Sequence, residues 1–145
     1  MTNKEFEVKE YLSQAYYLEL KMNNCMNELE RIRAMMVKSS SIVITGKNDG
    51  MRRNRTEELL VKFMDYTTRL EKGIDKYSKK LVEISDAINL VEDEKSQLVL
   101  FMRYIQHKSW ESICSTMHYE RRWIFDLHLK GLKELVNKKV CTKMH

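Results

Sequence analysis

The chain has 145 residues, of which 43% are hydrophobic, and it contains no proline and only four glycines. This length and composition suit one compact unit or two small helical ones and exclude a disordered tail. With so few residues that interrupt a helix, we expect an all-α fold. Cys25, Cys114 and Cys141 form no CxxC pair, which argues against a disulfide framework or a zinc knuckle and favours free thiols in a reducing cytosol.

The net charge of +5 is concentrated toward the C-terminal end. Residues 103–145 contain nine Lys or Arg against four Asp or Glu, so this segment carries the whole +5 and the first 102 residues sum to zero. A basic end on a neutral body is typical of a polyanion-binding module, although basic C-termini without a ligand are also common. No run approaches the roughly 18 apolar residues of a membrane span, and the charged N-terminus is no export signal, so we expect a cytoplasmic protein without a membrane partner.

Two long helices with heptad seams are predicted in residues 1–91. The first covers residues 5–36, with its seam at Tyr11, Ala15, Leu18, Met22, Cys25, Leu29, Ile32 and Met36. The second covers residues 57–91 and has Thr56 placed as its N-cap. Its seam is predicted at Leu60, Phe63, Thr67, Leu70, Ile74, Tyr77, Leu81, Ile84, Ile88 and Val91.

The segment between these helices, residues 37–55, is rich in serine, glycine, asparagine and basic residues and is predicted to be a flexible linker. It allows the helices to fold back as an antiparallel hairpin or coiled coil. Because the second helix is longer, part of its seam has no partner in the hairpin. That surplus, within residues 57–91, either forms a homodimer or packs on the C-terminal helices.

A second domain, residues 92–145, is predicted to contain three helices. Asp93 is a plausible N-cap of the first, which has Leu98, Phe101, Met102 and Ile105 on its inner side. Ser109 can cap a short helix, Trp110–Met117, and after a brief turn the last helix covers residues 120–138.

The last two of these helices match a helix-turn-helix motif, which needs a small residue at the helix crossing and inward apolar residues at fixed offsets. Cys114 is the small residue, and the predicted inward residues are Ile113, Met117, Ile124, Leu127, Leu132 and Leu135. Two positions depart from the usual pattern. His118 replaces the turn glycine, and Glu120 replaces the Ser or Thr cap; histidine tolerates left-handed φ, and a glutamate is favourable near a helix N-terminus.

With Ile124 and Leu127 inward, the N-terminal half of the last helix is the part predicted to enter a DNA major groove. Arginine can bind guanine or phosphate, and aromatic side chains can contact thymine methyls or sugars. Asp126 repels phosphate unless it accepts from cytosine or pairs with arginine. In the alternative, Trp123 and Phe125 pack on the neighbouring helix and the arginines are solvated. The candidate DNA-binding residues are Lys108, Ser109, Arg121, Arg122, Trp123, Phe125, Asp126, His128 and Lys130.

The stretch "LVLFMRYIQHKSWESICSTMHYERRWIFDLHLKGLKEL", residues 98–135, resembles region four of sigma-70 factors and, more closely, phage regulators of the ArpU and related uncharacterised families. Their "YL", "RYI…SWE.I" and "RLH..AL" elements correspond to residues 11–12, 103–113 and 126–132. The resemblance implies a DNA-binding transcription regulator of phage late genes, encoded by a phage or prophage and acting in the bacterial host beside its RNA polymerase. Asp126 stands where the family has a basic residue, and Gly131 where it has another small one.

Other classes of function are less consistent with the sequence. It has no glycine-rich phosphate loop, nucleophile elbow or HExxH motif, and its four histidines lack metal-ligand spacing, so we expect no enzyme, cofactor or metal site. The main alternative is a phage assembly or DNA-packaging protein, such as a small terminase subunit, or a coiled-coil interaction module. A third possibility is binding to RNA polymerase without DNA.

Overall fold

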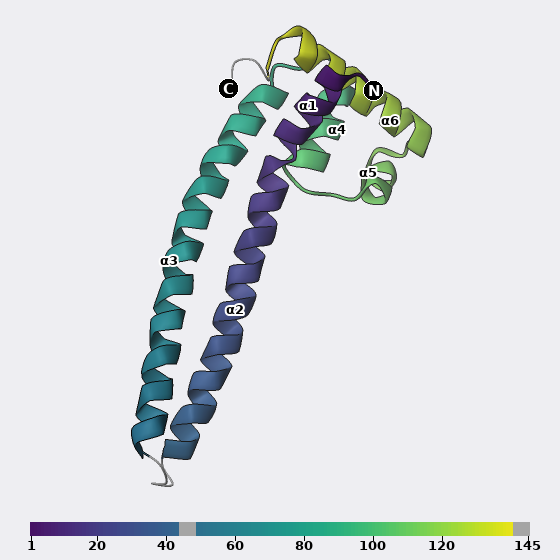
Figure 1. Cartoon of the computed structure of the whole chain (residues 1–145). Helices are drawn as coiled ribbons and strands as arrows, with labels where there is room; N and C mark the ends of the chain where they lie inside the picture. Colours follow the sequence, from purple (N-terminus) through teal and green to yellow (C-terminus); the bar gives the residue numbers. More distant parts are fainter. Residues whose placement is uncertain (44–48, 141–145) are drawn as a thin grey trace. The chain divides into compact units, whose positions relative to one another are not determined.

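The computed structural model describes the backbone of residues 1–43 and 49–140 and the side chains of residues 1–38 and 53–140. Every regular element in these ranges is an α-helix, which confirms the all-α class. No helix within them is both long enough and apolar enough to cross a membrane. The elements are α1 (Asn3–Leu12), α2 (Gln14–Val43), α3 (Asp49–Ile88), α4 (Glu94–Tyr104), α5 (Trp110–Met117) and α6 (Arg121–Asn137), all drawn in Figure 1.

The chain divides into two compact units. One contains residues 1–18 together with the chain from residue 77 onward, and the other contains residues 19–76. The first unit therefore joins α1 and the end of α3 to the three C-terminal helices, whereas the sequence suggested a domain that begins at residue 92. We call the two parts the head unit and the hairpin unit.

The predicted helix 5–36 is interrupted at Ser13, where α1 ends and α2 follows. The Ser13 hydroxyl donates to the Lys9 carbonyl oxygen at 2.8 Å, a side-chain bond that competes with regular helix formation. At the other end of α1, Thr2 and Glu5 form a capping box. The Glu5 amide donates to Thr2 Oγ1 at 3.3 Å, and the Thr2 amide donates to Glu5 Oε2 at 3.0 Å.

In the hairpin unit, α2 and α3 lie side by side in opposite directions (Figure 1), and Gly73 faces the Met22 side chain. The predicted linker 37–55 is wrong where the structure describes it, because α2 continues to Val43 and α3 begins at Asp49. Residues 44–48 of that prediction lie outside the described residues. Nothing in the linker sequence is a proline, and an established helix extends cooperatively through serines at little cost. Thr56 consequently lies inside α3 and not at its N-cap.

The predicted seam of α3 holds at Phe63, Thr67, Leu70 and Tyr77, which are half-buried, but fails at two positions of the hairpin unit. Leu59 is buried and Gly73 half-buried, whereas Leu60 and Ile74 are each 46% exposed. Among the described side chains of residues 19–76, only Ile32 and Leu59 are buried. The hairpin unit therefore has little core of its own.

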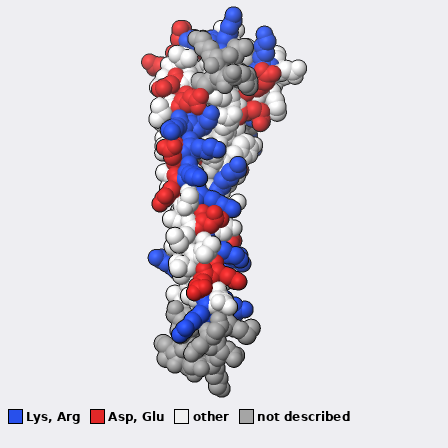
Figure 2. Space-filling model, turned by 60° about the vertical axis from the view of Figure 1, so that its left-hand side comes forward, with Lys and Arg blue, Asp and Glu red and all other residues white. Residues whose placement is uncertain are grey.

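Charge on the hairpin unit is mixed in sign. Arg31 pairs with Glu28 at 3.0 Å and Arg69 with Asp65 at 3.2 Å. On the face drawn in Figure 2, acidic and basic side chains are interspersed along the long helices. This surface does not present the continuous positive charge that binds a polyanion.

The core of the head unit draws on five helices: α1, the start of α2, the end of α3, α4 and α6. Val91 and Val140, which follow α3 and α6, complete it. Residues 84, 88 and 91 of the predicted second seam lie in this core, so the seam beyond residue 77 packs on the C-terminal helices, as one of the two alternatives required. The buried members are Val8, Tyr11, Leu12, Ala15, Ile84, Ala87, Ile88, Val91, Leu100, Tyr104, Leu132, Leu135 and Val140.

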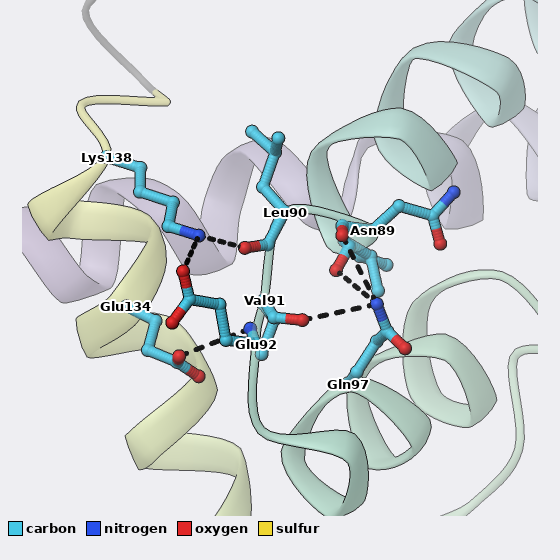
Figure 3. Close-up of polar contacts among 8 residues, drawn as sticks. Asn89, Leu90, Val91, Glu92, Gln97, Glu134 and Lys138 are labelled. Carbon is cyan, nitrogen blue, oxygen red and sulfur yellow. Dashed lines mark hydrogen bonds and ion pairs between the residues drawn. The ribbon is translucent and has the colours of Figure 1, made fainter.

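The C-terminal end of α3 is held by side chains from α4 and α6 (Figure 3). Gln97 donates through its amide nitrogen to the carbonyl oxygens of Ile88, Asn89 and Val91, at 3.2–3.5 Å. The ammonium of Lys138 donates to the Leu90 carbonyl oxygen, and the Glu92 amide donates to Glu134 Oε1 at 3.2 Å. Gln97 and Lys138 thus supply donors to carbonyl oxygens at and just beyond the end of α3, and Glu134 supplies an acceptor to an amide there.

Helix α4 begins at the predicted cap. The Ser96 amide donates to Asp93 Oδ2 at 3.0 Å, which confirms Asp93 as the N-cap. The predicted inner side was wrong at Leu98, which is 47% exposed, because the buried stripe follows Val99 and Leu100 instead.

Gly131 allows α4 and α6 to approach closely. A Cβ at this position would lie 2.8 Å from Leu100 Cδ1 and 3.5 Å from Ser96 Cβ, and both neighbouring residues are fully buried. Close packing therefore explains a glycine inside a helix, where it costs about 1 kcal/mol relative to alanine.

We predict that Gly131→Val lowers the free energy of unfolding by about 2 kcal/mol, because overpacking a fully packed contact costs roughly 1–3 kcal/mol. Gly73→Ala is the control, since its Cβ would meet only the flexible Met22 side chain at 3.3 Å and should be neutral or slightly stabilising. Urea denaturation followed by circular dichroism measures both. Equal effects of the two substitutions would contradict the role given to Gly131.

Candidate nucleic-acid interface

Helix α5, a three-residue turn and α6 form the predicted helix-turn-helix arrangement. The Ser112 amide donates to Ser109 Oγ at 3.1 Å, which confirms Ser109 as the N-cap of α5. His118 ends α5 in the left-handed conformation, with φ 59° and ψ 40°, so histidine fills the place of the turn glycine. Glu120 is the N-cap of α6, but its side chain makes no capping hydrogen bond.

A small core fixes α5 and α6 on α4. Ile113 and Ile124 are fully buried, and Leu127 is nearly so, together with Val99 and Met102 of α4. Cys114 and Met117 pack against this cluster, as the motif required. The inward positions predicted from the sequence are therefore confirmed, and the orientation of α6 about its own axis follows from them.

The opposite face of α6 is exposed. Of the nine candidate residues, six project from this helix with exposed side chains: Arg121, Arg122, Trp123, Phe125, Asp126 and Lys130. A groove on this face is lined by Glu120, Arg122, Trp123, Asp126, Leu127 and Lys130. The groove thus combines two cations, two carboxylates and an aromatic ring.

Ring contacts hold the two aromatic candidates without burying them. The Trp123 ring stacks on Tyr119 with centroids 4.5 Å apart and planes 14° apart, and Phe125 meets the edge of Trp110 at 5.0 Å. Trp123 nevertheless remains 50% exposed and Phe125 40% exposed. The packing alternative is therefore correct in part, since both rings touch neighbouring side chains and also present a surface to solvent.

The basic candidate residues differ in the side chains that they contact. The Arg121 guanidinium carbon lies 5.4 Å from the Phe125 ring centroid. The Lys130 ammonium lies 3.2 Å from Asp93 Oδ1. Hydrogen bonds from Ser96 first, and then from Lys130, lower the pKa of Asp93. Lys130 must therefore break its ion pair with Asp93 before it can contact a phosphate. This pair is exposed to solvent and contributes little to the stability of the fold.

Lys108 and Ser109 lie just before α5. Ser109 is exposed although its hydroxyl caps the helix, and Lys108 is half-buried. The carbonyl oxygen of Lys108 accepts from Arg103 Nη1 at 3.0 Å, and the Arg103 guanidinium carbon lies 4.6 Å from the Trp110 ring centroid. Arg103 thereby fixes the segment that carries both candidates.

His128 was predicted as a contact residue, and this prediction was wrong. It follows Ile124 by one helical turn, so it lies on the inward face, where it is 5% exposed. Its Nε2 is 2.6 Å from the Tyr104 hydroxyl, and its ring meets the edge of Trp110 at 4.9 Å. Burial first, and then the charges of Lys9 and Arg103, lower the pKa of His128 to about 4, so the ring is neutral at pH 7.

Three residues near this face were missed from the sequence. Lys133 is exposed seven residues after Asp126, so helical periodicity puts it on the same face. Lys95 of α4 lies 5.4 Å from the Tyr119 ring centroid and 5.6 Å from that of Trp123. Periodicity could have found Lys133, but only the folded structure brings Lys95 and Tyr119 to Trp123.

Comparison with known proteins places the chain in a family. Residues 36–136 match the family described as "Protein of unknown function (DUF1492)", and the chain belongs to this family. The match includes all of α3, α4 and α5 and all but the last residue of α6. Neither the curated proteins nor the solved structures contain a match.

The buried His128 predicts a loss of stability in acid. In the unfolded chain it takes up a proton near pH 6.5, but in the folded chain only near pH 4, so the unfolded state binds the extra proton between these values. The contribution of the neutral His128 to the free energy of unfolding is complete above pH 6.5. It falls by up to about 3 kcal/mol as the pH drops to 4. Urea titrations at pH 4–7 measure this slope.

His128→Gln should flatten the slope, whatever its effect on stability at pH 7. His118→Asn is the control, because His118 is exposed and asparagine also tolerates left-handed φ, so the slope should persist. An unchanged slope in His128→Gln would assign the acid sensitivity to other groups.

Proposed function

We propose that the protein is a sequence-specific DNA-binding transcription regulator that inserts the N-terminal half of α6 into the major groove of double-stranded DNA. The observation that carries the proposal is the exposure of Arg121 and Arg122 at the start of a helix whose opposite face is buried. A helix held in this way by a preceding helix and turn is the element that reads base edges in helix-turn-helix proteins. The two arginines supply donors for guanine or phosphate.

The surroundings of α6 support this use. Trp123 and Phe125 offer half-exposed rings that are already held by their neighbours, so little side-chain freedom is lost when they contact thymine methyls or sugars. Lys130, Lys133 and Lys95 add positive charge around the same face. On the face of the hairpin unit drawn in Figure 2, the described side chains mix charges of both signs.

The phage late genes as targets, and host RNA polymerase as a partner, rest on the sequence resemblance to ArpU-like regulators and to sigma region four. The same resemblance implies a phage or prophage protein that acts in the cytoplasm of a bacterial host. Co-purification with polymerase tests the partner independently of DNA binding.

We also propose that the protein forms a homodimer through α3, over residues 60–74. The part of the predicted dimer seam beyond residue 77 is already occupied by the head unit. Leu60, Met64 and Ile74 remain 46–61% exposed, and their spacing places them on one stripe of α3. A second copy suits this stripe because charges of both signs lie within the same residues, among them the exposed pair Asp65 and Arg69, and can complement themselves across a two-fold axis.

The DNA-binding proposal predicts that Arg121→Ala with Arg122→Ala weakens binding to a selected DNA fragment by about 1–3 kcal/mol per lost base contact. For the unchanged protein, the logarithm of affinity should fall with log salt at a slope near −0.9 per neutralised phosphate. Fluorescence anisotropy across a salt series measures both quantities. Arg53→Ala with Arg55→Ala removes the same charge from the exposed surface of α3 and serves as the control.

Equal affinities of the α6 variant and the control would refute the assignment of α6. A salt-independent complex, or capture of polymerase without any DNA shift, would favour a protein-binding role. A large ring in solution would favour a small terminase-like packaging protein.

The dimer proposal predicts a dimeric mass in sedimentation at micromolar concentration. Leu60→Ser with Ile74→Ser should shift the protein to the monomer, since both changes remove apolar area from the stripe. Val61→Ser, at a side chain that is 66% exposed but 100° further round the helix, should leave the dimer intact. A monomeric mass of the unchanged protein would exclude this dimer.

A further inference from the structure

Asp126 lies in the middle of the exposed face of α6, in the groove between Arg122 and Lys130. These two cations are one helical turn away on either side, at four residues each. Among the described residues neither forms an ion pair with Asp126, and Lys130 turns instead to Asp93 at 3.2 Å. The carboxylate is therefore available to whatever enters the groove.

A carboxylate in this position limits what the exposed face of α6 can bind. Ionised aspartate only accepts hydrogen bonds, and it repels the phosphates that the flanking cations attract. In a major groove it consequently favours the floor, where base edges lie, over the phosphate walls. Arg122 and Lys130 offset its charge while it lies there.

The four bases differ in how they meet such an acceptor. Guanine presents O6 and N7 and thymine presents O4, all of them acceptors that repel a carboxylate. Adenine places the acceptor N7 beside its N6 amine, whereas cytosine presents the N4 amine without a second acceptor beside it. Cytosine is thus the base whose edge is most complementary to Asp126.

We propose that Asp126 accepts a hydrogen bond from the N4 amine of a cytosine in the major groove and so selects a C·G pair at one position of the binding site. The proposal rests on the proposed function, because it requires α6 to enter the groove. It goes further by naming the base and the atom that one side chain recognises.

The test is selection of bound fragments from a random duplex pool, with the full chain and with Asp126→Ala and Asp126→Asn. The unchanged protein should prefer cytosine at one position by about five- to tenfold, the lower end of what a good base contact gives. Asp126→Ala should reduce this preference to less than about twofold at that position only. Asp126→Asn should shift it toward adenine, since asparagine can donate to N7 and accept from the N6 amine.

The control is Asp86→Asn, which makes the same change of charge at an exposed position of α3 outside the groove and should keep the cytosine preference. An enriched motif that stays identical in both Asp126 variants would overturn the cytosine contact and leave the DNA-binding proposal standing. Loss of the preference in the Asp86 control as well would assign it to net charge and also overturn the contact. Failure of the unchanged protein to enrich any sequence would overturn both proposals together.

Discussion

The packing of α6 against its neighbouring helices is the constraint on which the rest of the head unit depends. Toward its N-terminus, Ile124 and Leu127 enter the small core with α4 and α5. Toward its C-terminus, Leu132 and Leu135 enter the larger core with α1, α4 and the end of α3. Gly131 lies between these two cores and allows α4 to approach. Once this helix is fixed on its buried sides, only one face remains for a ligand, and that face carries the arginines.

Much of this arrangement could be predicted because local signals and tertiary packing agree. Asp93 and Ser109 cap the helices they were expected to cap, and His118 adopts the left-handed φ that the turn requires. The predictions failed where a local signal was weak. Serines and two glycines between the long helices were interpreted as a loop, yet they do not forbid a helix, and helix covers most of that segment. In α3 two apolar stripes lie side by side, so the sequence alone could not decide whether Leu59 or Leu60 faces α2.

The candidate interface shows the same limit at the level of single side chains. Helical periodicity placed Arg122 and Asp126 on the exposed face, because one buried stripe determines the opposite one. Arg121 lies three residues before Ile124, on the buried side, and is exposed at the first position of the helix. His128 follows Ile124 by one helical turn and therefore lies on the buried face, where Tyr104 and Trp110 from other helices contact it. Polar character suggested an exposed ligand contact, whereas a neutral imidazole with one hydrogen-bond partner is readily buried. Lys95 approaches Trp123 only through the fold, so no spacing in the sequence indicates it.

The contacts at the C-terminal end of α3 determine which part of the chain can fold independently. The groups that cap α3 belong to Gln97 and Lys138, and the apolar cover of Leu132 and Leu135 includes residues of α1 and α3. The three C-terminal helices therefore do not form a self-sufficient module, although the motif lies entirely within them. A fragment that starts at residue 92 would expose part of the apolar side of α6 around Leu132 and Leu135 to water, because the N-terminal 18 residues, distant in sequence, belong to the same compact unit.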